Sequence, residues 1–354
     1  MQGGIVLFAK RPGVTSFSSL FSIKRALGTK KVGHTGTLDS FASGLLVVCT
    51  GSLTRIASYI TSFNKTYDAV IEFGSETDTL EYTGKIVKAA PLPKKDDVLS
   101  AIKQYTGDIL QTPPLFSALH INGERASDIA RSGRVAEMPS RPVTVYASEA
   151  EEFLFEDGRV KAVRVRFSVS KGTYIRSLAR DIGSCCKSAA HLAGLRRLSV
   201  GSFRLEDAAG FSSLAPFTLQ SVYQTISDMQ KTQSASCKAD ASEQTPHSKE
   251  NEQSEVLEKM QSMTERLAAE CGFGTAHIFP EYEDDFKHGR PLFSSMFEKE
   301  ADGACAASAE FSANGHCTSG GVGSIAVFGK HGNFLGMISR NGENAYSYAF
   351  VIPD

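Results

Sequence analysis

A polar stretch at residues 227–253 interrupts this chain of 354 residues and divides it into two unequal parts. The stretch contains no Val, Leu or Ile, so it cannot bury enough apolar surface to order itself. We therefore predict that residues 220–270 form a disordered linker that ends in a short amphipathic helix. Residues 1–219 are predicted to form the main domain, and residues 271–354 a small β-rich domain with a flexible loop at about 301–323.

Hydrophobic periodicity in the first part of the chain indicates a mixture of strands and helices. Apolar residues alternate with Arg164, Arg166 and Ser168 along residues 160–169, which predicts a strand with one buried face and one solvated, positive face. Separate helices among hairpin-like strands indicate an α+β fold rather than a doubly wound sheet. The other predicted elements are strands at 5–9, 45–49 and 66–73, a helix at 94–105, and a helix that Gly28 ends and whose apolar face carries Phe17, Leu20, Phe21 and Leu27.

The charge is unevenly distributed, although the formal net charge is only −1. Residues 1–38 contain six Lys or Arg and no Asp or Glu, and residues 161–205 contain ten Lys or Arg and a single acid, Asp181. The compensating acids lie mainly at residues 240–258 and 281–285. Two basic blocks favour a positive face that binds polyphosphate, although a single basic block is more often an ordinary solvated surface.

Several classes of protein do not fit the composition. The seven cysteines show no C-x-x-C pair and no histidine spacing for zinc, so we expect reduced thiols and no metal site. No apolar run approaches the roughly 20 residues that a membrane span needs, and the apolar start at residues 4–9 is too short for the core of a signal peptide. We therefore expect a cytoplasmic protein that neither crosses a membrane nor is secreted.

The loop that follows Lys30 and Lys31 has the composition of a binding site. Gly33 and Gly36 allow another chain to approach the backbone closely, and the lysine pair at its start could bind phosphate. Asp39 is the first acid in the sequence and follows this basic segment. Its carboxylate either takes part in chemistry or caps a turn, and the loop alone does not decide between these roles.

Arg176 breaks a local rule of helix formation. Residues 171–181 are predicted to begin a helix with Thr173 as N-cap, and a capping box would place Glu or Gln at position 176. A cation in the first turn also opposes the helix dipole. Because no structural gain offsets this cost, we suspect a functional role for Arg176. Tyr67, which follows Lys65 at the start of a strand, is by itself more typical of a core residue.

Five motifs occur at separate places in residues 1–219. They are K-R-P-G-V-T-S at 10–16, G-H-T-G-T-L-D at 33–39, K-T-Y at 65–67, Q-T-P-P-L-F-S-A-L at 111–119 with a continuation to 131, and G-T-Y-I-R-S-L-A-R-D at 172–181 followed by H-L at 191–192 and L-R-R at 195–197. In this order and at this spacing they resemble the TruB family of tRNA pseudouridine synthases. Each motif is moderately specific, and all five together are not expected by chance.

The resemblance implies the pseudouridine-synthase fold, with a mixed, largely antiparallel sheet flanked by helices. It also implies a thumb insertion at about 111–143 and a small C-terminal β domain that is weakly similar to the PUA type. The activity implied is that of an isomerase, which breaks the N-glycosidic bond of a uridine and rejoins the ribose to carbon without a metal, nucleotide or redox cofactor. The substrate implied is uridine 55 in the T-loop of tRNAs, bound through the T-arm by a monomer with no evident protein partner.

The resemblance also implies roles for individual residues. Asp39 would attack the uridine at C6 of the base or C1′ of the ribose, Arg176 would hold Asp39 charged and oriented, and Tyr67 would stack on the base. Leu195 would form the opposite apolar wall, and His34 would fill the space that the flipped base vacates. The other substrate-binding residues implied are Tyr174, Lys10, Lys30, Lys31 and Lys65, of which Lys10, Lys30 and Lys31, with the second basic block, would contact phosphates.

The sequence departs from the family pattern at a few positions. Ser40 and Ser43 stand where Pro and Thr are usual, which could loosen the catalytic loop, and Arg11 replaces a Pro. In the thumb, His120 and Ser127 stand where Lys and Tyr are usual. Two other functions stay open: a tRNA-binding chaperone with little turnover, and a synthase that acts on another RNA or within a guide-RNA particle.

Overall fold

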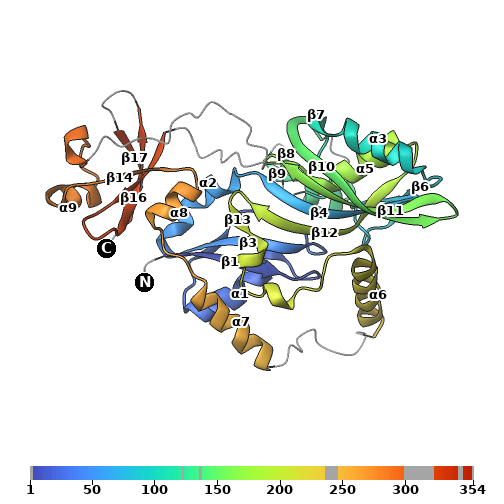
Figure 1. Ribbon diagram of the computed structural model, residues 1–354, viewed down its shortest axis with the longest axis horizontal. Helices are drawn as coiled ribbons and strands as arrows, with labels where there is room; N and C mark the ends of the chain where they lie inside the picture. Colours follow the sequence, from blue (N-terminus) through green and yellow to red (C-terminus); the bar gives the residue numbers. More distant parts are fainter. Residues whose placement is uncertain are drawn as a thin grey trace.

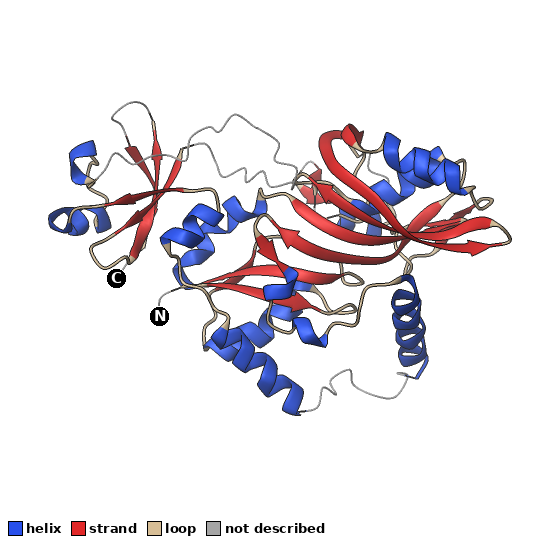
Figure 2. Ribbon diagram, viewed as in Figure 1, coloured by secondary structure: helices blue, strands red, loops and turns tan. Residues whose placement is uncertain are grey.

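The computed structural model describes residues 3–117, 119–121, 123–134, 138–235, 246–298, 323–341 and 346–352. These residues form a large mixed sheet with helices on both faces and a smaller sheet beside it at the C-terminal end (Figures 1 and 2). The arrangement is the α+β architecture predicted from the sequence. Residues 301–322 of the predicted flexible loop lie outside the described residues.

The large sheet has nine strands in the order β1-β3-β12-β4-β11-β10-β7, with β2 paired to β3 and β13 paired to β12. Each pair is antiparallel except β3 with β12, which is parallel. The predicted mixed, largely antiparallel sheet is therefore confirmed. Its strands are β1 (Ile5–Lys10), β2 (Val32–His34), β3 (Ser43–Thr50), β4 (Lys65–Phe73), β7 (Gly107–Gln111), β10 (Arg141–Glu156), β11 (Arg159–Val169), β12 (Ala190–Val200) and β13 (Phe203–Arg204).

Helices cover both faces of this sheet. On one face α3 and α5 pack over β4, β11 and β12 through buried residues such as Ile102 and Leu178. On the other face α6 packs through Leu219 and Val222 (Figure 1). The helices are α1 (Ser16–Leu27), α2 (Ala57–Thr61), α3 (Lys95–Gln104), α4 (Ala126–Arg131), α5 (Ile175–Cys185), α6 (Leu219–Ala235), α7 (Pro246–Glu258), α8 (Glu265–Glu270) and α9 (Glu283–Lys287). Two small hairpins are formed by β5 (Ser75–Thr77) with β6 (Ile86–Ala89) and by β8 (His120–Ile121) with β9 (Glu124–Arg125).

Helix α1 forms where its capping residues predict it but leaves half of its apolar face uncovered. The Thr15 hydroxyl accepts a hydrogen bond in the first turn, and Gly28 ends the helix in the left-handed conformation at φ +60°. Leu20 packs against the sheet, whereas Phe17 and Phe21 are 62% and 58% exposed. Residues on one helical face need not all reach the core, because the face is wider than the contact with the sheet.

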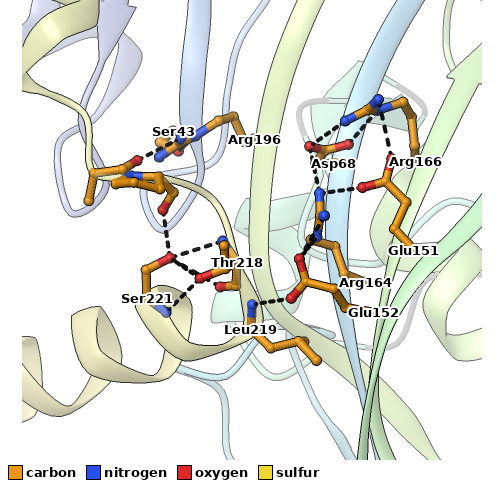
Figure 3. Close-up of polar contacts among 12 residues, drawn as sticks. Ser43, Asp68, Glu151, Glu152, Arg164, Arg166, Arg196, Thr218, Leu219 and Ser221 are labelled. Carbon is orange, nitrogen blue, oxygen red and sulfur yellow. Dashed lines mark hydrogen bonds and ion pairs between the residues drawn. The ribbon is translucent and has the colours of Figure 1, made fainter.

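The polar face of β11 is electrically neutralised by its neighbours. The Asp68 carboxylate on β4 lies 3.3 Å from the Arg164 guanidinium and 2.8 Å from that of Arg166, and Glu151 on β10 contacts both arginines (Figure 3). The prediction that this face is solvated is confirmed, since Arg166 is exposed, but the prediction that it is positive is wrong. Periodicity shows which residues share a face of one strand, but the register that brings acids beside them depends on the adjacent strands.

The predicted linker is helical over much of its length. Helices α6 and α7 lie largely within residues 220–270, so the prediction of disorder is wrong for those segments. The Leu219 N–H at the start of α6 donates to the Glu152 carboxylate at 3.0 Å (Figure 3), and Val256 of α7 is fully buried beside α1. A few apolar contacts thus order segments whose own composition is polar. Instead of one amphipathic helix, α7 and α8 are separate, and residues 236–245 lie outside the described residues.

The small sheet has the strand order β14-β15-β16-β17 and extends the core of the large one. Its Phe328 and Met337 belong to the same buried cluster as Leu53 and Ile56, which follow β3. The strands predicted at 325–328 and 334–339 agree with β15 and β16, so the small C-terminal β unit is confirmed. The four strands are β14 (Gly274–His277), β15 (Ser324–Phe328), β16 (Phe334–Arg340) and β17 (Tyr346–Val351).

Candidate active site

The loop that carries Asp39 connects β2 to β3 and is fixed on both sides of the carboxylate. Before it, the Leu38 N–H donates to the Ser16 hydroxyl at 2.8 Å, and that hydroxyl donates back to the Leu38 carbonyl at 2.9 Å. After it, the Lys10 ammonium donates to the Ala42 carbonyl at 2.6 Å. The serine that begins α1 and the last residue of β1 therefore hold the backbone around Asp39.

Gly44 shows why the strand that follows this loop needs a glycine. Its φ is +112°, and a Cβ at this position would lie 2.3 Å from the Arg197 carbonyl oxygen. Here β3 runs parallel to β12, with Gly44 opposite Arg197. Any side chain would force β3 away from β12 and displace the loop that ends at β3.

Asp39 and Arg176 form an ion pair. The Arg176 Nε lies 2.9 Å from Oδ2 of Asp39, and Nη2 donates to Oδ1 at 3.1 Å. The arginine side chain is only 6% exposed and also donates to the carbonyls of Thr79 at 2.9 Å and Phe116 at 3.0 Å, whereas the Asp39 side chain is 35% exposed. A guanidinium held at several points presents a fixed cation to a carboxylate that can still be reached from outside.

A cavity of about 490 Å³ opens in front of this pair. Tyr67 on β4 and Leu195 on β12 are both buried and contribute apolar surface from adjacent strands of the sheet. A volume of this size falls in the range of sites that enclose small molecules or single bases. The cavity is lined by Thr35, Gly36, Thr37, Leu38, Asp39, Thr61, Lys65, Tyr67, Phe116, Ser117, Arg125, Ser127, Ser170, Gly172, Thr173, Tyr174, Ile175, Arg176, Leu195 and Arg197, all within residues 1–219.

Two of the predicted substrate-binding lysines are buried. Lys10 is fully buried and donates to the carbonyls of Arg11, Ser40 and Ala42, and its burial lowers its pKa to about 8. The prediction that Lys10 contacts phosphate is therefore wrong, because its ammonium already donates to backbone carbonyls inside the protein. Lys65 lines the cavity but donates to the carbonyls of Thr61 and Phe63, and burial lowers its pKa to about 7.

Of the remaining predicted residues, Tyr174 lines the cavity, whereas Lys30, Lys31 and His34 do not. Lys30 and Lys31 are exposed at the start of β2, where they are accessible to phosphate. His34 lies one residue before the cavity lining, and its Nδ1 is buried without a hydrogen-bond partner among the described residues. Burial lowers the pKa of His34, and the nearby Arg197 guanidinium lowers it further, so both effects favour a neutral imidazole.

Arg197 is a site residue that sequence reasoning did not single out. It is buried, donates to the Leu45 carbonyl at 2.7 Å and donates to the Gly36 carbonyl at 3.1 Å. Arg197 therefore joins the loop that carries Gly36 and Asp39 to β3. It lies directly opposite Tyr67 in the register of β12 with β4. The only sequence signal was its place at the end of the L-R-R motif.

Replacing Lys10 by Met should change how stability depends on pH. The pKa of Lys10 is about 8 in the folded chain and close to its ordinary 10.5 in the unfolded chain, so between these values the unfolded chain binds more protons. The free energy of unfolding of the wild type should therefore rise relative to that of Lys10→Met, by about 1.5 kcal/mol between about pH 8 and about pH 9.5. Urea unfolding at both pH values measures this difference, and Lys94→Met, at an exposed lysine, is the control. A difference in the free energy of unfolding between wild type and Lys10→Met that does not change with pH would contradict the prediction.

Comparison with known proteins places this arrangement in a family. Residues 24–175 match the family model described as TruB family pseudouridylate synthase (N terminal domain). The chain is 42% identical over 223 residues to tRNA pseudouridine synthase B of Borreliella burgdorferi, a match that covers 63% of this chain and 78% of that relative. The chain belongs to the TruB family. It is also 46% identical over 229 residues to tRNA pseudouridine synthase B of Treponema denticola, across 60% of this chain but only 64% of that relative's length, slightly less than two thirds.

Solved structures with low sequence identity share the fold. The structure of a Cbf5–Nop10–Gar1 complex contains a chain that matches with a TM-score of 0.60 and 21% identity, over 99% of this chain and 85% of that one. Membership in the TruB family and the predicted pseudouridine-synthase fold are therefore confirmed. Within the described part of the chain, no helix is long and apolar enough to cross a membrane, and no cluster of three or more His, Cys, Asp or Glu could hold a metal ion.

Proposed function

We propose that this TruB-family chain converts uridine 55 in the T-loop of tRNAs to pseudouridine. The observation that supports this most strongly is the Asp39 carboxylate, held by the Arg176 guanidinium at 2.9 Å and accessible from a cavity of about 490 Å³. A protein that only binds RNA gains nothing from a partly exposed carboxylate in its RNA-binding cavity, because a negative charge repels phosphate. The arrangement therefore favours catalysis over a chaperone role.

In this proposal Asp39 is the nucleophile. Its oxygen forms a bond to C6 of the base or C1′ of the ribose, the N1–C1′ bond breaks, and the base turns so that C5 bonds to C1′. The bond between Asp39 and the nucleotide then breaks and returns the free carboxylate. The proton on C5 is then lost and N1 gains one, which leaves the composition of the nucleotide unchanged. Arg176 orients the Asp39 carboxylate, while Tyr67 and Leu195 enclose the base between buried apolar surfaces and limit the access of water.

The RNA must present its base outside the helical stack for Asp39 to reach it. The segment between β7 and β10, where we predict the thumb, contributes Phe116, Ser117, Arg125 and Ser127 to the cavity wall, so it is placed to contact an extruded nucleotide. In this proposal Lys30 and Lys31, which are exposed, contact phosphates of the RNA and make its affinity dependent on salt. A T-arm substrate, a monomeric state and a cytoplasmic location belong to the same proposal.

Release of tritium from RNA labelled at C5 of uridine tests this proposal, because each isomerisation expels the C5 hydrogen. We expect the protein to release one equivalent from an unmodified tRNA transcript and from its isolated T-arm hairpin, and none from the transcript with cytidine at position 55. Binding without release would favour the chaperone. Release that persists in the cytidine transcript, or occurs only in other RNAs, would show a different target.

A further inference from the structure

Gln111 is a buried residue next to the active site. Its side-chain amide makes two hydrogen bonds that the proposed reaction does not explain. Gln111 ends β7 and is 1% exposed. Its Nε2 donates to the Tyr174 carbonyl at 3.1 Å, and its Oε1 accepts from the Tyr174 N–H at 2.8 Å. One side chain thus satisfies both backbone groups of a single residue, as a neighbouring strand would do in a sheet. Gln111 is not among the residues that line the cavity.

The residue that Gln111 holds is the one from which α5 begins. Tyr174 occupies the N-cap position, and its side chain makes no capping hydrogen bond to the helix. Arg176 follows as the second residue of α5, so its guanidinium depends on the placement of this first turn. A shift of the Tyr174 backbone would therefore move the cation that faces Asp39.

The segment that follows Gln111, residues 112–116, accepts hydrogen bonds from α5 at two further carbonyls. The Thr112 carbonyl accepts from the Ser177 hydroxyl at 2.8 Å and from the Arg180 guanidinium at 2.9 Å. The Phe116 carbonyl accepts from Arg176 itself at 3.0 Å. Residues 111–116 and the first two turns of α5 are thus connected by a series of hydrogen bonds that ends at the catalytic ion pair.

Gln111 also stands where both ends of the predicted thumb meet. In the register of β7 with β10, Gln111 lies opposite Arg141, so residues 112–140 leave and re-enter the sheet at this pair. The thumb segment beyond Gln111 contributes Ser117, Arg125 and Ser127 to the cavity wall, where RNA would press on it. If the thumb moves relative to the sheet, Gln111 moves at its base, and Gln111 is the residue that bonds Tyr174.

We propose that Gln111 is a positioning residue that couples the thumb to the Asp39–Arg176 pair. When the thumb is seated on RNA, its base holds Tyr174 and hence Arg176 in the arrangement that aims Asp39. This inference rests on the proposed function, since it concerns the rate of the same reaction. It predicts a loss in the chemical step rather than in RNA binding.

Two variants remove the coupling in different ways. Gln111→Met has nearly the same length and removes both hydrogen bonds, whereas Gln111→Glu keeps the acceptor for the Tyr174 N–H and sets an oxygen against its carbonyl. We expect the single-turnover rate on tRNA to fall about tenfold to hundredfold in both, because misplacement of a catalytic group by about 1 Å has effects of this size. The Kd for tRNA should stay within about twofold of the wild-type value. Leu110→Ala is the matched control, because Leu110 directly precedes Gln111 in β7 and is 75% exposed.

A double-mutant cycle with Arg176→Lys separates positioning from general damage to the fold. If Gln111 acts through Arg176, the Gln111→Met change should slow the Arg176→Lys enzyme much less than it slows the wild type. Equal losses in both backgrounds, or a wild-type rate in folded Gln111→Met and Gln111→Glu, would overturn the inference. Thermal melting verifies folding of each variant. A wild-type protein that releases no tritium would instead contradict the proposed function.

Discussion

Replacing Asp39 by Asn should abolish pseudouridine formation and leave tRNA binding nearly unchanged. The amide has almost the same shape as the carboxylate but is a poor nucleophile and carries no charge for Arg176 to stabilise. We expect the single-turnover rate to fall at least about 10⁴-fold, since binding and orientation alone would remain. Tritium release measures the rate, and filter binding of the same transcript measures the affinity. Removal of a negative charge from the cavity should, if anything, tighten binding of the RNA.

Asp285→Asn is the matched control for this experiment. Asp285 also pairs with an arginine, Arg290, and is partly exposed, but it lies in α9 and does not line the cavity. The control should retain most of the wild-type rate. Turnover by Asp39→Asn at a rate close to that of the wild type would show that another group attacks the uridine. Loss of tRNA binding together with turnover would assign Asp39 a role in binding or folding instead.

The residues around Asp39 illustrate what sequence can and cannot reveal about a site. Arg176 could be singled out because it violates the capping pattern of its own helix, which is a local property. The role of Lys10 could not be inferred in this way, since a lysine that donates to buried carbonyls and a lysine that binds phosphate have the same sequence signature. What distinguishes them is the position of Ser40 and Ala42, thirty residues away, which the pairing of β1 with β3 brings beside Lys10.

The same limit applies to the fold. Alternation of Val and Arg correctly predicts that β11 is a strand with one buried face, because periodicity is encoded within the strand itself. It does not reveal that Asp68 on β4 neutralises Arg164 and Arg166. Composition likewise fails for α6 and α7, whose sequences are polar overall. Their order depends on single apolar residues such as Val256, which pack on surfaces that exist only once the rest of the chain has folded.

Arg176 should be the second most sensitive position in the protein. Its guanidinium contacts both oxygens of Asp39 and the carbonyls of Thr79 and Phe116, a planar set of donors that an ammonium cannot reproduce. We expect Arg176→Lys to lower the single-turnover rate about 10²-fold to 10³-fold by loss of orientation with retention of charge. Arg176→Met should lose about a further tenfold, because Asp39 then faces a cavity without its cation. Arg159→Lys, on an exposed hairpin, is the control.

The comparison between these two variants decides what the ion pair does. If the positive charge itself stabilises the reacting carboxylate, Lys should recover a measurable part of the rate that Met loses, with similar melting temperatures for both variants. If the arginine serves mainly to join α5 to Thr79 and Phe116, both variants should lose stability together and their rates should be alike. An Arg176→Met enzyme that keeps a tenth of the wild-type rate would show that Asp39 reacts without a cation. The ion pair would then be structural, and the positioning assigned to Gln111 would have no catalytic group to act on.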